Sequence, residues 1–216
     1  MWHKWLSFAA LVFTLSGCAI FSNETVERLL EEKVFQRENL PTRVVSVAIV
    51  VDADISDDNV HAVVEESSAL LMRQVGIRLE AVIYREKLHA RTIKELHQFL
   101  RKFRAEHPDF DFIAAVSRNG SDDPDECPNK RLCRIASIAE DRNIAMLDLY
   151  AKVLIHEIGH GFGALHSQSG VMMAYPTTVY FSVADREIVL RHKWKVFRDD
   201  IFPTSLEREG LNDGGH

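Results

Sequence analysis

Residues 150–166 read Tyr-Ala-Lys-Val-Leu-Ile-His-Glu-Ile-Gly-His-Gly-Phe-Gly-Ala-Leu-His. The apolar residues around the histidines predict a helix. On a helix, His156 and His160 project from the same face one turn apart, so both imidazoles can bind one metal ion. Glu157 lies beside them, where its carboxylate can reach a water molecule on that metal. The stretch therefore predicts a helix that carries a metal site.

The last histidine of the stretch needs a turn to join the other two. A straight helix would place His166, six positions after His160, on a different face. Gly163 can adopt a positive φ at little cost, so the chain can reverse there and return His166 as a third ligand. Three neutral histidines leave one position open for water, which is typical of catalytic zinc. Zinc would lower the pKa of that water to about 7, and Glu157 would take its proton and pass it to the leaving amine.

These residues form the pattern His-Glu-x-x-His-x-x-Gly-x-x-His, and the chain resembles the metzincin clan of zinc endopeptidases. The second hallmark of that clan is a methionine turn beneath the zinc, and residues 170–176 read Gly-Val-Met-Met-Ala-Tyr-Pro. The pattern leaves open whether Met172 or Met173 is the turn residue. The resemblance also gives Tyr175 two alternatives: it approaches the zinc or the oxyanion in some metzincins and is structural in matrixin-like members.

The resemblance covers most of residues 43–197 and implies an α/β (α+β) fold of metzincin type. That fold has a mixed twisted sheet, two long helices including the zinc helix, and a small C-terminal subdomain with the methionine turn and a final helix, here over 183–197. Hydrophobic periodicity agrees with this order of elements. It predicts strands over 43–51, 77–84, 110–117, 135–140 and 143–149, and helices over 57–76 and 92–107.

Within the clan, the matrixins are the most similar subfamily. Ser167 directly follows the zinc motif, and Phe181-Ser182-x-x-Asp185 precedes the final helix, as in matrixins. Two features differ from that subfamily. The interval from His166 to the methionines is short, and residues 19–42 contain no cysteine that could cap the zinc, so inhibition by a propeptide cysteine is not expected.

The N-terminal 17 residues predict a signal peptide. Lys4 precedes an apolar stretch of about 11 residues, too short for the ~20 that span a membrane. The next residues, Leu15-Ser16-Gly17-Cys18, resemble the lipobox of bacterial lipoproteins, which implies acyl chains on Cys18; a plain signal peptide is the alternative. Ala19, where inner-membrane lipoproteins often carry Asp, favours the outer membrane if the cell is Gram-negative. We expect a spacer over 18–42, a catalytic domain over 43–200 and a tail over 201–216.

Two further cysteines, Cys127 and Cys133, lie in a polar loop over residues 118–134. In an exported protein they predict a disulfide, with free thiols or metal ligands as alternatives. Four acidic residues in the same loop are compatible with a Ca²⁺ site or with a solvated acidic loop.

Composition excludes several functions. Of the 216 residues, 46% are hydrophobic and 27% charged, as in ordinary globular proteins and unlike collagen or disordered chains. Lys and Arg number 26 against 32 Asp and Glu, a net charge of −6, so no basic field attracts nucleic acid. The expected partners are a protein or peptide substrate and a membrane reached through the lipid; the oligomeric state stays open.

The function expected from these patterns is zinc-dependent hydrolysis of peptide bonds by a membrane-tethered endopeptidase. Two alternatives stay open: a lipoprotein that binds zinc and peptides without cleaving them, and an amidase acting on cell-wall peptides. We expect substrate to add to the strand over 135–140, with a side-chain pocket walled by residues 174–181.

Overall fold

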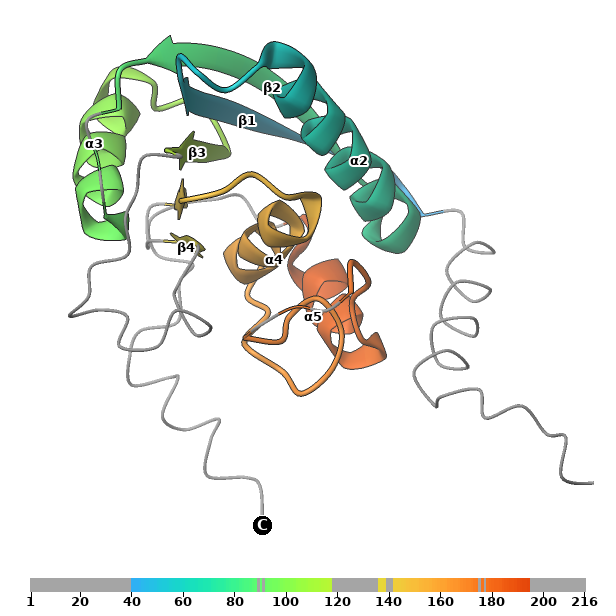
Figure 1. Cartoon of the computed structure of the whole chain (residues 1–216). Helices are drawn as coiled ribbons and strands as arrows, with labels where there is room; N and C mark the ends of the chain where they lie inside the picture. The colour runs from blue at the N-terminus through green and yellow to red at the C-terminus, as the bar shows by residue number, and fades with distance from the viewer. Residues whose placement is uncertain are drawn as a thin grey trace, which may run out of the picture. The chain divides into compact units, whose positions relative to one another are not determined.

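The strands form one mixed sheet in the part of the chain that the structure describes (Figure 1). The computed structural model describes residues 40–117 except 89 and 91, residues 136–138, and residues 142–194 except 175 and 177. The strands are β1 (Arg43–Asp52), β2 (Ile77–Glu86), β3 (Phe112–Val116), β4 (Ala136–Ile138) and β5 (Asn143–Met146), in the order β2-β1-β3-β5-β4. Four of them run parallel, and β4 runs antiparallel to β5 at one edge.

Helices cover both faces of this sheet. Alternate residues of a strand point to opposite faces, so each strand contributes side chains to both cores. The helices are α2 (Asp57–Val75), α3 (Ile93–Glu106), α4 (Ala151–Gly161) and α5 (Val183–His192). Val47 and Ile49 of β1 share a buried core with α2, α4 and α5. Ala48 and Val50 face the other way and pack with α3. Helix α4, which carries His156, Glu157 and His160, therefore packs on one side of the sheet.

Local signals in the sequence explain the helix ends. The Ser56 hydroxyl accepts a hydrogen bond from the Asn59 N–H and begins α2, which ends at Gly76 with a φ of 65°. Thr92 and Glu95 form a reciprocal capping box at the start of α3. The helices predicted over 57–76 and 92–107 are confirmed within a residue or two at each end.

The final helix is shorter than predicted. The sequence predicted a helix over 183–197, whereas α5 ends at His192 and Lys193 follows in a turn. The guanidinium of Arg43 donates to the carbonyl of Lys193, and the Lys193 ammonium donates to the carbonyl of Pro41. The carbonyl and the ammonium group of Lys193 are thus bonded to Arg43 and Pro41, at the point where the helix was predicted to continue. The strand predicted over 143–149 is also shorter, because β5 ends at Met146. Of the strand predicted over 135–140, the structure describes residues 136–138, and these form β4.

Several predictions fall outside the described residues. They concern Cys18 and the signal peptide, the disulfide between Cys127 and Cys133, the Ca²⁺ loop, Tyr175 and the C-terminal tail. Among the helices that are described, none has both the length and the apolar character needed to cross a bilayer.

Candidate metal centre

Helix α4 carries the first two histidines of the motif and Glu157. Most of its residues are buried, because it packs on the sheet through Leu154, Ile155 and Ile158, each fully inaccessible to solvent. His156 and Glu157 are 6% and 4% exposed. Burying these polar side chains is costly unless they are held by partners or serve a site, so their position needs an explanation beyond packing.

The two histidines of α4 point their Nε2 atoms at each other, 2.9 Å apart. The opposite ring nitrogens meet backbone carbonyls: His156 Nδ1 lies 2.7 Å from the oxygen of Val171, and His160 Nδ1 lies 2.7 Å from the oxygen of Ala164. A carbonyl oxygen can only accept, so each Nδ1 carries the proton and each Nε2 presents a lone pair. Backbone carbonyls that fix the tautomer in this way are a regular feature of zinc-binding histidines.

His166 completes the group after a sharp turn. Gly163 has a φ of 89°, in the left-handed region that glycine tolerates, and the chain reverses there. The His166 ring centre lies 4.8 Å from that of His160 and 5.3 Å from that of His156. One ligand nitrogen from each of the three rings lies within 4.8 Å of the others, so the group can hold a metal ion. The three residues predicted as ligands are thus brought together.

Exposure changes across the three histidines. His156 is buried, His160 is half-buried and His166 is exposed, so the group opens to solvent at His166. Burial lowers the pKa of His156, the hydrogen bond to the Val171 carbonyl raises it, and the nearby His166 lowers it. The net lowering favours the neutral imidazole, which is the form that binds metals.

Of the two candidate methionines, Met172 packs against α4. Met172 is fully buried, whereas Met173 is half-buried. A Cβ atom built on Gly159 would come within 2.6 Å of the Met172 sulfur, so glycine is needed there for helix and methionine to approach so closely. The carbonyl of Met172 also accepts a hydrogen bond of 3.0 Å from the Ser167 N–H, next to His166.

Sequence reasoning missed the residues that hold the turn after the third histidine. The Asp185 carboxylate, 4% exposed, accepts hydrogen bonds of 2.8 Å from the Ser167 hydroxyl and 2.6 Å from the Ser182 hydroxyl. Asp185 lies 18 residues after Ser167. In the sequence, Ser167 and Ser182-x-x-Asp185 carry only the resemblance to matrixins, and nothing in their spacing indicates a bond between Asp185 and Ser167.

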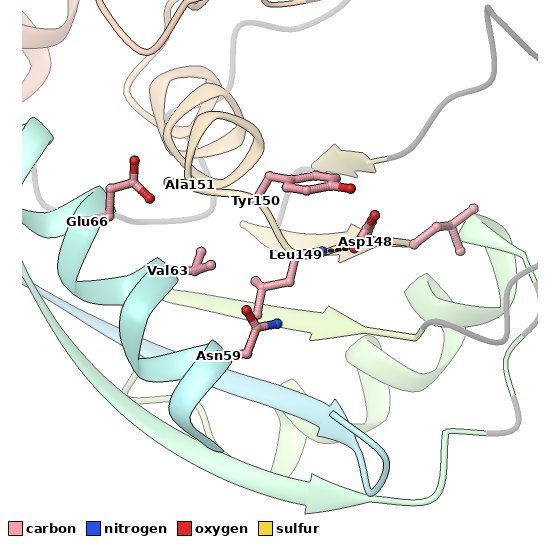
Figure 2. A pocket seen from close by; sticks show the side chains of 8 residues that line it. Asn59, Val63, Glu66, Asp148, Leu149, Tyr150 and Ala151 are labelled. Atoms are coloured by element: carbon pink, nitrogen blue, oxygen red, sulfur yellow. Dashed lines mark hydrogen bonds between the residues drawn. The ribbon is translucent and has the colours of Figure 1, made fainter. Parts of the chain in front are cut away.

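A separate pocket lies beside the N-terminal end of α4 (Figure 2). It has a volume of about 510 Å³ and lies between Asn59, Val63 and Glu66 of α2 and residues 147–151. None of the three histidines lines it. The figure shows Tyr150 and Asp148 on the side opposite α2.

Comparison with known proteins supports the fold. No family model matches this chain, and no curated protein matches it by sequence. Among solved structures, archaemetzincin from Methanopyrus kandleri is similar, with a TM-score of 0.52 and 18% identity over 70% of this chain and 96% of that chain. The chain has a zincin-like α/β fold, as its sequence predicted.

Proposed function

We propose that this protein is a zinc-dependent endopeptidase. The observation that carries the proposal is the convergence of His156, His160 and His166, with the Nδ1 atoms of the first two held by backbone carbonyls. Three neutral imidazoles without a cysteine suit zinc and leave a position for water. The likeness in fold to archaemetzincin supports the same class.

The proposed chemistry is divided among residues of α4 and of the segment that follows it. The three histidines would hold the ion, and bound zinc would supply an acidified water and polarise the scissile carbonyl. Glu157 follows His156 directly in the chain, and its carboxylate would take the proton from the attacking water and deliver it to the leaving amine. The buried Met172 forms the floor under the helix. A protein that only binds peptides would have no use for Glu157 as a proton carrier.

Cleavage and binding can be separated by changing Glu157. The purified protein should contain close to one zinc per chain and should cleave members of a proteome-derived peptide library, with loss of cleavage in chelator. Glu157→Ala and Glu157→Gln should retain zinc and lose most hydrolysis, because the base is removed and the ligands are not. Zinc-loaded wild type that cleaves no peptide would support the binding alternative, and cleavage confined to cell-wall peptides would support the amidase.

The membrane tether is a separate part of the proposal. Its support is the sequence Leu15-Ser16-Gly17-Cys18 at the end of the apolar stretch. Cys18→Ser removes the thiol that would receive the lipid, so this variant should incorporate no labelled fatty acid and should not be anchored. Labelling of the Cys18→Ser form would contradict the lipobox assignment.

A further inference from the structure

Gln74 is a buried polar residue that the zinc motif does not include. It lies in the last turn of α2 and is 1% exposed. Both ends of its amide bond to one segment of backbone: Nε2 donates to the Val179 carbonyl at 3.0 Å, and Oε1 accepts from the Phe181 N–H at 2.7 Å. These partners lie 105 and 107 residues further along the chain. The side chain thus pairs with residues 179–181 as a neighbouring strand would.

The segment held by Gln74 leads directly to the metal centre. Between the two bonded residues lies Tyr180, whose carbonyl accepts a hydrogen bond of 2.6 Å from the Val171 N–H. The carbonyl of Val171 in turn lies 2.7 Å from His156 Nδ1. Val171 is fully buried, so water is a poor substitute for these bonds.

We infer that Gln74 is a positioning residue for the metal centre. It fixes residues 179–181, these fix Val171, and the Val171 carbonyl sets the orientation of the His156 ring. A residue that orients a metal ligand through backbone hydrogen bonds affects metal affinity without touching the metal. The inference rests on the proposed function only for the identity of the metal.

The chemistry of the amide explains why glutamine is needed. Phe181 requires an acceptor and Val179 requires a donor, and an amide supplies one of each. Glutamate at this position supplies only acceptors when ionised, so it can keep the Phe181 bond and must lose the Val179 bond. Methionine fills a similar volume and supplies neither, which leaves two buried backbone groups without their partner.

The test compares Gln74→Met and Gln74→Glu with wild type. The readouts are the zinc dissociation constant, measured by competition with a chelator, and the visible absorption spectrum of the Co²⁺-substituted protein. We expect Gln74→Met to weaken zinc binding about tenfold and to change the Co²⁺ spectrum, with Gln74→Glu between it and wild type. If Gln74→Met does not fold, Gln74→Glu alone decides through the same two measurements.

A destabilised control separates positioning from general loss of stability. Leu100 lies in α3 and is fully buried in the core on the opposite face of the sheet. Leu100→Ala should lower Tm and leave both zinc affinity and the Co²⁺ spectrum as in wild type. Wild-type affinity and spectrum in the folded Gln74 variants would overturn the inference while leaving the proposed function intact. A wild-type protein that binds no zinc would overturn both.

Discussion

The Nδ1 atom of His156 lies 2.7 Å from the carbonyl oxygen of Val171, fifteen residues along the chain. This bond joins α4 to the segment that contains Met172. A backbone carbonyl holds the ring here, so the backbone path through residues 170–172 decides where the His156 lone pair points. Changes to that path should therefore alter metal binding even where no ligand is replaced.

Gly170→Ala tests this dependence. Gly170 has a φ of 75°, and an added Cβ would lie 2.5 Å from the Ser182 nitrogen and 2.9 Å from the Tyr180 oxygen. Since backbone atoms cannot move aside cheaply, we expect unfolding free energy to fall by about 1–3 kcal/mol and zinc affinity to fall with it. Urea unfolding and zinc titration measure the two effects.

The control for this prediction is Thr92→Ala, which removes the capping box of α3 on the other face of the sheet. Its cost should be about 1 kcal/mol with no change in zinc affinity. Equal zinc affinity in Gly170→Ala and wild type would show that the Val171 carbonyl does not control the His156 ring.

The two methionines should respond differently to truncation. Met172 is fully buried against Gly159, so Met172→Ala should lower the unfolding free energy by about 2–5 kcal/mol. Met173 is half-buried, and Met173→Ala should cost about 1 kcal/mol or less. Denaturant unfolding of both variants checks the order of the two losses; the reverse order would contradict the placement of Met172 under α4.

Asp185→Ala probes the bonds behind the third histidine. The Asp185 carboxylate accepts from the Ser167 and Ser182 hydroxyls, and its loss should cost about 1–3 kcal/mol of unfolding free energy. Ser167 directly follows His166, so zinc affinity should also fall. Asp185→Asn keeps one oxygen acceptor and should lose less of both. Stability lost without any change in zinc affinity would limit Asp185 to a structural role.

Much of the fold could be predicted from the sequence because its signals are local. The β-branched run over 43–51, the glycine at the end of α2 and the capping box of α3 each act within a few residues. The three histidines share this property, since their spacing on one helix and one turn brings them together.

The groups that hold the histidines in place could not be predicted, because they are backbone carbonyls or side chains far away in the sequence. Every residue has a carbonyl, so nothing in the sequence distinguishes those of Val171 and Ala164 as the partners of histidine rings. Gln74 meets Phe181 across 107 residues. Whether Met172 or Met173 faces Gly159 depends on the path of the turn, which two adjacent methionines do not reveal.

The buried Lys193 should make stability depend on pH. Burial lowers its pKa, and the nearby Arg43 and Arg186 lower it further. Between this lowered pKa and the ordinary value of 10.5, the unfolded chain therefore binds more protons than the folded one, and stability rises as pH increases through that window. As pH rises, the unfolding free energy of wild type should increase relative to that of Lys193→Met. A difference independent of pH would mean that Lys193 titrates alike in both states.

The edge position of β4 leads to the last prediction. In the described sheet β4 pairs with β5 on one side only, so its other side can accept an extended peptide as an additional strand. Neighbouring residues of a strand direct their N–H groups to opposite sides, so one of Ser137 and Ile138 bonds to β5 and the other faces the open edge.

Proline removes the N–H at the position where it is placed. Of Ser137→Pro and Ile138→Pro, we expect one to lose stability through the β5 pairing, and the other to fold, bind zinc and cleave peptides with a raised KM. Both kinetic constants and zinc content are measured for each variant, with Thr92→Ala as a control for mild destabilisation. If the variant that folds and holds zinc cleaves with the KM of wild type, substrate does not dock on β4, and the peptide must be held elsewhere even if the protein is a protease.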